Sequence, residues 1–249
     1  QLKSFFDYMG ISELDWMPEC AATYKTGIKF KGWSTKVGFA DYFHPFPSQP
    51  DDYTAPAFFY NSFLRRTGID LAAHPDEFFL ASYLAEHQLA PIAAYEFPFK
   101  VGYGYHFDSG LLGKFLRKHA IQLGVRHLDA RVQEVKLGEN GYIKQLVMQD
   151  QQTCEADLFI DCTGFSGLLI QQTLKVPFVS FAKNLFNDSA VVMPSPQAEA
   201  LHPQSVSTAL SSGWMWNIPL TSRIGNGYVY SSDFCSPDAA EFELRRQLH

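Results

Sequence analysis

Hydrophobic side chains recur every three or four residues at both ends of the chain, which is the spacing of one face of an α-helix. The apolar positions of the first helix are Leu2, Phe5, Phe6 and Met9. Gly10 can end this helix, and Ser236-Pro237 can begin another that extends to the last residue. Because the two helices reach Gln1 and His249, the pattern predicts an interior piece of a longer protein.

An alternating pattern predicts β-strands in two other parts of the chain. Over residues 23–33, one face would carry Tyr24, Thr26, Ile28 and Phe30, and the other Lys25, Gly27, Lys29 and Lys31. We therefore expect one strand with its lysines on a common face, and alternation does not show which lysine, if any, turns inward. Several further strands, broken by Pro and Gly, are expected over 188–234.

Helical and strand patterns alternate through the middle of the chain. After a loop-like stretch over 34–56, helices are expected at about 57–67 and 75–88, and another from Asp108 to Gly124. The segments that follow are a strand over 125–137, a turn at Asn140-Gly141, a return strand over 142–148, a buried strand over 156–162 and a helix over 166–174. This mixed order predicts an α/β fold.

The composition narrows the class of protein. Of 249 residues, 46% are hydrophobic and 18% are charged, which is typical of a folded domain. The net charge is −6 and no basic cluster is present, so nucleic-acid binding is not expected. No apolar run reaches the roughly 20 residues that span a bilayer, so a membrane is not an expected partner either. The four cysteines form no CxxC pair, which argues against a metal site and favours a cytoplasmic location.

Two segments could contact a flat ligand, and each also has a plain structural explanation. Residues 157–167 contain a predicted strand that runs into a turn at Gly164. The backbone of this turn could approach a cofactor, and the next helix could offer its N–H groups. An ordinary strand-to-helix turn also explains this segment, and the chain has no GxGxxG phosphate loop. Trp214 and Trp216 lie two residues apart on one strand face, where they could wall a ligand or fill a core.

Two further segments could carry chemistry. A lysine of the 23–33 strand that turns inward could hydrogen-bond an oxidant or act as a nucleophile, whereas a solvated lysine face is the plain alternative. His44 and Phe46 lie in an aromatic, proline-rich loop and could hold a flat substrate between their rings. A surface loop is the alternative for these two residues.

Taken in order, these segments resemble the flavin-dependent tryptophan halogenases over nearly the whole chain. Residues 213–219, Gly-Trp-Met-Trp-Asn-Ile-Pro, match the paired-tryptophan motif WxWxIP of that family. Residues 24–30, Tyr-Lys-Thr-Gly-Ile-Lys-Phe, match the strand with its catalytic lysine, which corresponds to Lys25 and not to Lys29. Residues 105–108 resemble the stretch that opens the family's long helix, and 155–164 match its second flavin-contact region.

The resemblance implies a role for each candidate residue. Lys25 would be catalytic, and Val132, Thr163 and Gly164 would contact FAD. His44 and Phe46 would line the substrate pocket, and Trp214 and Trp216 would keep the substrate away from the flavin. The family's GxGxxG would precede Gln1, and its glutamate that assists ring deprotonation would follow His249.

The implied fold is α/β, the glutathione-reductase-like fold of FAD-dependent monooxygenases and halogenases, truncated at both ends. Within this interior fragment, about 1–33 and 105–180 would be flavin-module elements, and about 34–104 and 181–249 would be substrate-side elements. A homodimer is consistent with the resemblance.

The implied activity is chlorination or bromination of an electron-rich aromatic such as tryptophan or another indole. Reduced FAD from a separate flavin reductase would form a hydroperoxide with dioxygen, halide would convert it to hypohalous acid, and Lys25 would present that acid to the ring. Because the loop over 45–56 departs from the regioselective tryptophan enzymes, a phenol or pyrrole is also open as substrate. The alternatives are a flavin-dependent aromatic hydroxylase and a truncated fragment that only binds an aromatic ligand.

Overall fold

The computed structural model describes residues 2–248, and their contacts divide them into two compact units. The larger unit takes in the chain up to Lys118 and again from Leu185, and the smaller unit is His119–Asn184. The helices predicted at the two ends are confirmed as α1 (Leu2–Met9) and α6 (Pro237–Leu248), while Gln1 and His249 lie outside the described residues. No helix among the described residues has the length and apolar character needed to cross a membrane.

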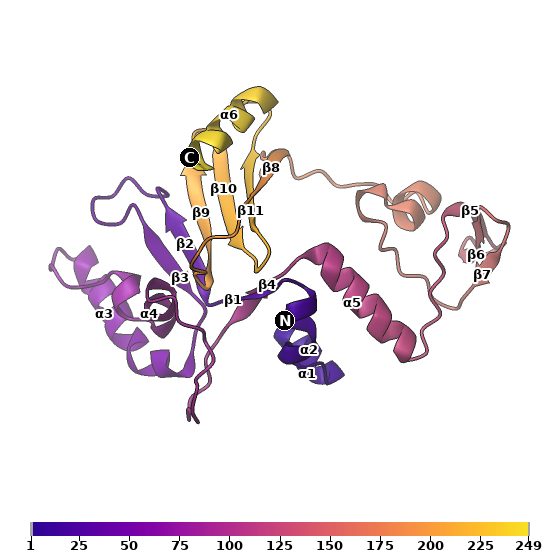
Figure 1. The fold of residues 1–249 in the computed structure, drawn as a ribbon. Coiled ribbons are helices and arrows are strands. Elements are labelled where there is room, and N and C mark those ends of the chain that lie inside the picture. The colour runs from indigo at the N-terminus through magenta and orange to yellow at the C-terminus, as the bar shows by residue number, and fades with distance from the viewer. Residues whose placement is uncertain (1, 249) are drawn as a thin grey trace. The chain divides into compact units, whose positions relative to one another are not determined.

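A six-stranded sheet organises the larger unit (Figure 1). In spatial order its strands are β3 (Tyr42–Pro45), β2 (Gly27–Lys31), β9 (Gln204–Leu210), β10 (Gly213–Pro219), β11 (Ile224–Tyr230) and β8 (Ser189–Ser195). Only the β2–β9 pair is parallel, and β8 to β11 confirm the strands expected over 188–234. The sheet therefore joins residues near the start of the chain to residues near its end.

Helices cover one face of this sheet. On β10 and β11, the buried residues Met215, Tyr228 and Tyr230 pack against α6 through Ala240 and Leu244. On β3, Phe43 packs against α4 (Leu80–Glu86). The strand register puts Phe43 and Met215 on the same side, so the other side of the sheet carries the side chains of the candidate site.

A second core lies around the two-stranded sheet of β1 (Thr23–Lys25) and β4 (Gly104–His106). The helices around it are α1, α2 (Glu13–Glu19) and α5 (Ser109–Gln122), which pack through buried Phe6, Trp16, Cys20, Leu112 and Phe115. The start and end predicted for α5 are confirmed, because the Asp108 carboxylate accepts a hydrogen bond from the Leu111 N–H and Gly124 has a φ of +90°.

The region between β2 and β4 is more ordered than its composition suggests. The stretch predicted as a loop over 34–56 contains β3 and a turn of 3-10 helix at Gln49–Tyr53. The helix predicted at 57–67 is α3 (Ala55–Arg66). The helix predicted at 75–88 is two elements, a 3-10 turn at Pro75–Glu77 and then α4, since Phe79 has an extended conformation between them.

The smaller unit is built on a three-stranded antiparallel sheet. Its strands are β5 (Val132–Leu137), β6 (Ile143–Met148) and β7 (Thr153–Glu155), and the predicted hairpin turn at Asn140-Gly141 joins the first two. The strand predicted over 125–137 begins only at Val132, because residues 125–131 have no strand partner among the described residues.

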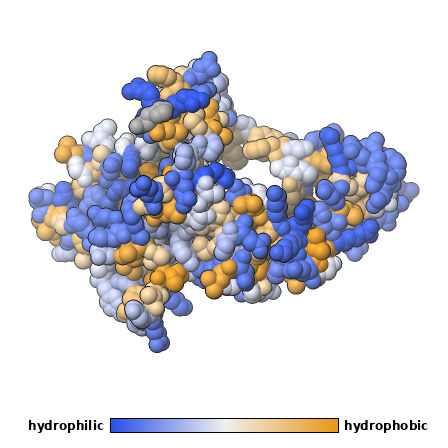
Figure 2. Space-filling view, viewed as in Figure 1, coloured by the Kyte–Doolittle hydropathy of each residue, from blue (hydrophilic) through white to orange (hydrophobic). Residues whose placement is uncertain are grey.

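The buried strand predicted over 156–162 is wrong. This segment pairs with no strand among the described residues, and the side chains of Leu158 and Ile160 are 75% and 77% exposed. It leads into a turn at Gly164–Ser166 and a short helix at Leu168–Thr173 with wide, i to i+5 hydrogen bonds. Such exposed apolar side chains are mixed with hydrophilic ones over the surface in Figure 2.

Candidate functional site

Thr26 interrupts the strand predicted over 23–33 and thereby separates Lys25 from the other lysines. Thr26 is fully buried, and its N–H and hydroxyl both donate to the Pro203 carbonyl, at 2.7 and 2.9 Å. Its own carbonyl accepts the Phe46 N–H at 2.8 Å. Because the alternation restarts after this break, Lys25 lies on a different side from Lys29, which pairs with Asp76. The expectation of a common lysine face is therefore wrong.

Lys25 lies on a cavity of about 460 Å³ that borders the open face of the sheet. The residues that line this cavity with it are Ile28, Phe30, Trp33, Ser205, Val206, Ser207, Trp214, Trp216 and Ile218. Burial lowers the pKa of the Lys25 amine below its ordinary value, since the cavity walls are mostly apolar. The structure thus provides an inward lysine with a more accessible neutral form.

The two tryptophans form a wall of the lysine cavity. Trp214 and Trp216 lie on the same face of β10, as their spacing predicts, and their ring centroids are 6.1 Å apart. The register places Trp216 directly opposite Ser207 on β9, and Phe30 of β2 lies beside that serine. A Cβ at Gly227 would lie 2.1 Å from the Trp216 ring, so the glycine leaves the space that this indole needs.

The two residues of the predicted substrate pocket have different surroundings in the structure. The Phe46 ring lies under Lys25, with its centroid 5.7 Å from Nζ, although Phe46 does not line the tryptophan-walled cavity. His44 is exposed on the edge strand β3, opposite Ile28. Lys25 therefore lines the cavity and also lies over the Phe46 ring, which is outside the cavity lining.

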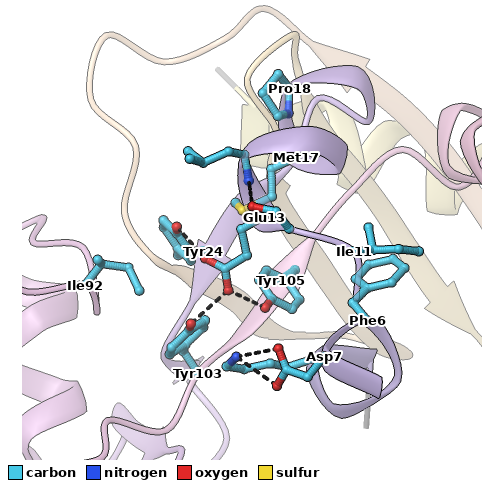
Figure 3. A pocket seen from close by; sticks show the side chains of 13 residues that line it. Phe6, Asp7, Ile11, Glu13, Met17, Pro18, Tyr24, Ile92, Tyr103 and Tyr105 are labelled. Carbon is cyan, nitrogen blue, oxygen red and sulfur yellow. Dashed lines mark hydrogen bonds and ion pairs between the residues drawn. The ribbon is translucent and has the colours of Figure 1, made fainter. Parts of the chain in front are cut away.

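The opposite face of β1 is anchored by three tyrosines that share one carboxylate (Figure 3). Tyr24, Tyr103 and Tyr105 each donate their hydroxyl to Glu13, at 2.9, 2.8 and 2.6 Å. Burial, and then the hydrogen bond to Glu13, raise the pKa of Tyr24 to about 12, so it remains protonated and able to donate. Because neighbouring strand residues point to opposite faces, this anchor directs Lys25 away from the tyrosines.

A buried polar chain accompanies Lys25 on its own face of β1. The Thr23 hydroxyl donates to the Pro219 carbonyl at 2.7 Å and lies 3.0 Å from His106 Nδ1. The other ring nitrogen, Nε2, lies 2.9 Å from the hydroxyl of Ser205, which lines the cavity. Burial and the charge of Lys25 lower the pKa of His106 to about 3, so the imidazole is neutral. The sequence patterns did not identify His106 or Ser205 as site residues. His106 was included only in the segment over 105–108 that opens α5, and Ser205 was not named.

The predicted flavin turn lies in the smaller unit and differs in one respect from expectation. The Asp161 carboxylate accepts the N–H groups of Leu169 and Ile170, at 2.9 and 3.0 Å, and the Thr163 hydroxyl accepts that of Leu168. The Thr163 hydroxyl itself donates to Asp161, and these bonds lower the pKa of Asp161 to about 2. The expectation that this helix offers free N–H groups to a cofactor is therefore wrong.

The same turn retains an open backbone surface. Gly164 has a φ of +63°, and no atom lies within 4 Å of the position that a Cβ would take. Val132 opens β5, which has a strand neighbour on one side only in the described sheet. The exposed backbone at Gly164 leaves room for a flat group, whereas the helix N–H groups beside it are bonded to Asp161 and Thr163 and do not fit a phosphate.

Comparisons with known proteins identify one family. A family model described as tryptophan halogenase matches residues 1–249. The chain is 35% identical to tryptophan 6-halogenase SttH of Streptomyces toxytricini, over 98% of this chain and 50% of that protein. It is also 35% identical to tryptophan 7-halogenase RebH of Lentzea aerocolonigenes, over 99% of this chain and 49% of that protein.

A solved structure agrees with these sequence matches. Xcc4156, a flavin-dependent halogenase from Xanthomonas campestris, superposes with a TM-score of 0.87 at 33% identity, over 100% of this chain and 49% of that one. The predicted α/β halogenase fold is thus confirmed. The chain spans about half the length of the curated relatives it matches.

The buried, neutral His106 predicts a specific loss of stability in acid. An unfolded histidine takes up a proton near pH 6.5, whereas folded His106 does so only near pH 3. The free energy of unfolding should therefore decrease as the pH is lowered through this range. His106 alone should contribute up to about 1.4 kcal/mol per pH unit to the decrease. Urea unfolding of the intact protein and of His106→Gln at pH 7, 6, 5 and 4 checks this. The variant should lose less stability on acidification, and parallel curves would contradict the assignment.

Proposed function

We propose, since the chain belongs to the tryptophan halogenase family, that the whole protein is a flavin-dependent halogenase of tryptophan or another electron-rich aromatic. The observation that carries this proposal is the half-buried Lys25 amine on a cavity walled by Trp214 and Trp216. The relatives named above are all halogenases, so the aromatic hydroxylase and the non-catalytic fragment are less well supported. We further propose a flavin reductase as partner, and a cytoplasmic location on the ground of four free cysteines.

Reduced FAD, when bound, would supply the oxidation of halide by dioxygen to hypohalous acid, and this chain would then control where that acid goes. We assign the tryptophan-walled cavity as the path of the acid and Lys25 as its end. The Lys25 amine can donate a hydrogen bond to the oxygen of the acid, which withdraws electrons from the oxygen and makes the halogen more electrophilic. The mostly apolar walls offer few groups that would compete for this bond.

The aromatic substrate would lie on the other side of Lys25, against the Phe46 ring. The contact of Phe46 with Lys25, outside the tryptophan-walled cavity, supports this assignment. As walls of the acid's path, the indoles of Trp214 and Trp216 would also keep an aromatic ring from reaching the flavin. His44 is assigned to the outer part of the same pocket, since it precedes Phe46 on an exposed edge.

Val132, Thr163 and Gly164 would contact the cofactor through backbone, and Thr163 would also hold the turn in shape through Asp161. We assign the elements over about 1–33 and 105–180 to the flavin side and those over 34–104 and 181–249 to the substrate side. This division concerns roles and differs from the division into two compact units. The flavin-side strand β2 and the substrate-side strand β9 are hydrogen-bonded to each other within the larger unit.

Replacing Lys25 tests the proposed reaction. In the intact protein supplied with reduced FAD, halide and tryptophan, Lys25→Ala should lower halogenated product by at least about a hundredfold while flavin oxidation continues, because the group that presents the acid is lost. Lys29→Ala is the matched control, since Lys29 lies on the same chain segment but pairs with Asp76 on the other face. Product is measured by mass spectrometry. Halogenation retained by Lys25→Ala, or lost equally in both variants, would contradict the role.

Replacing Phe46 tests the substrate side. Loss of an aromatic contact costs about 0.5–1.5 kcal/mol, so Phe46→Ala should raise KM by up to roughly tenfold with the rate of flavin oxidation unchanged. Phe59→Ala, an exposed phenylalanine on α3, serves as control and should leave KM as it is. An unchanged KM in Phe46→Ala would place the substrate elsewhere.

A pair of glycines tests the flavin turn. Gly164 and Gly141 both have positive φ, +63° and +79°, and open space at the Cβ position. Alanine at either position should cost a similar 1–2 kcal/mol or so of stability from backbone strain. Only Gly164→Ala should weaken FAD binding, by about tenfold or more, when measured by fluorescence titration. Equal FAD affinity in the two variants would remove Gly164 from the site.

A further inference from the structure

The hydrogen bonds around His106 determine where its proton lies. A threonine hydroxyl has one proton, and Thr23 donates it to the Pro219 carbonyl. Thr23 can therefore only accept from His106, so the imidazole proton must be on Nδ1. The neutral ring then presents a lone pair at Nε2. The strand pairing of Thr23 with His106 holds this arrangement in place.

The same argument fixes the hydroxyl of Ser205. Because Nε2 carries no proton, Ser205 must donate its hydroxyl proton to it, across 2.9 Å. The Ser205 oxygen is then left only with lone pairs for any partner in the cavity, which it lines together with Lys25. The Lys25 amine can donate in either protonation state, so the cavity offers a donor and an acceptor among mostly apolar walls.

We propose that the Ser205 oxygen binds the hydroxyl proton of hypohalous acid beside Lys25, and that His106 is a positioning residue that keeps this oxygen an acceptor. Lys25 would donate to the acid's oxygen and Ser205 would accept from its proton, so the oxygen is held twice and the halogen is the free end. This assignment rests on the proposed halogenase function. The two hydrogen bonds would retain the acid in the cavity until a substrate reacts with it.

Ser207 offers a matched control for Ser205. It lies two residues along β9, on the same face, is similarly buried and lines the same cavity. Its register partners are Phe30 and Trp216, whereas the partner of Ser205 on β2 is Ile28 and its hydroxyl is bonded to His106. A general effect of losing a hydroxyl from the cavity wall would therefore appear in both serine variants.

The test measures how much of the acid reaches the substrate. In the intact protein, halogenated product is counted per reduced FAD oxidised, and escaped hypohalous acid is collected with a β-diketone trap. Ser205→Ala should lower the product yield per flavin about tenfold, the effect of one lost hydrogen bond, with trapped acid rising to match. Ser205→Thr, which keeps the hydroxyl, should restore the yield, and Ser207→Ala, which leaves the bond between Ser205 and His106 in place, should lower the yield several-fold less than Ser205→Ala.

The outcomes separate the two proposals. If the unmodified protein yields neither product nor trapped acid, the halogenase function fails and this assignment fails with it. If the unmodified protein halogenates and Ser205→Ala keeps the same yield, or Ser207→Ala loses as much, only the present assignment is overturned. The proton position is tested without flavin, by ¹H–¹⁵N spectra of the imidazoles in the unmodified protein and in Thr23→Val. A proton on Nε2 of His106 in the unmodified protein would overturn the positioning role.

Discussion

The direction of Lys25 depends on the buried hydrogen bonds of Thr26. At this one residue, the bonds join three segments of the chain. Thr26 itself lies between β1 and β2, Pro203 directly precedes β9, and Phe46 directly follows β3. A continuous strand would have kept Lys25 on the face of Lys29 and Lys31, beside Asp76 and α4. Because the strand is interrupted at Thr26, Lys25 lines the same cavity as Ile28 and Phe30.

Two anchors on opposite faces of β1 then hold the lysine. On one face, three tyrosine hydroxyls converge on Glu13, and on the other Thr23 bonds to Pro219 and His106. Each anchor uses groups that would be costly to bury unpaired, so a shift of β1 by one residue would break both. Gly104 pairs with Lys25 across the two strands and lies beside the Phe46 ring. The Lys25 side chain is thereby held where it lines an apolar cavity and lies over an aromatic ring.

Features that depend on neighbours in the sequence were predictable. The start of α5 at Asp108, the Asn140-Gly141 turn and the shared face of Trp214 and Trp216 follow from local geometry, and the structure has all three. The two specific motifs were also sufficient to predict the family.

Features that depend on distant contacts were not predictable. Thr26 is bonded to a residue 177 positions away, and His106 to one 99 positions away, so alternation alone could not show which lysine turns inward or that a serine is held beside it. The apolar run over 156–162 has the composition of a buried strand, yet Leu158 and Ile160 are exposed because no described strand pairs with it. The free helix N–H groups were expected for a similar reason, since the pattern does not reveal that the Asp161 carboxylate turns back to accept them.

The central claim is that Lys25 lies between two regions, the acid's path along the tryptophans and the substrate's place against Phe46. A crystal structure of the intact protein with FAD and an accepted aromatic substrate measures this most directly. The account predicts the substrate ring on the Phe46 side of Lys25, with the lysine amine between it and the cavity of Trp214 and Trp216. A substrate ring inside the tryptophan-walled cavity, or a Lys25 side chain on the face of Lys29, would contradict it.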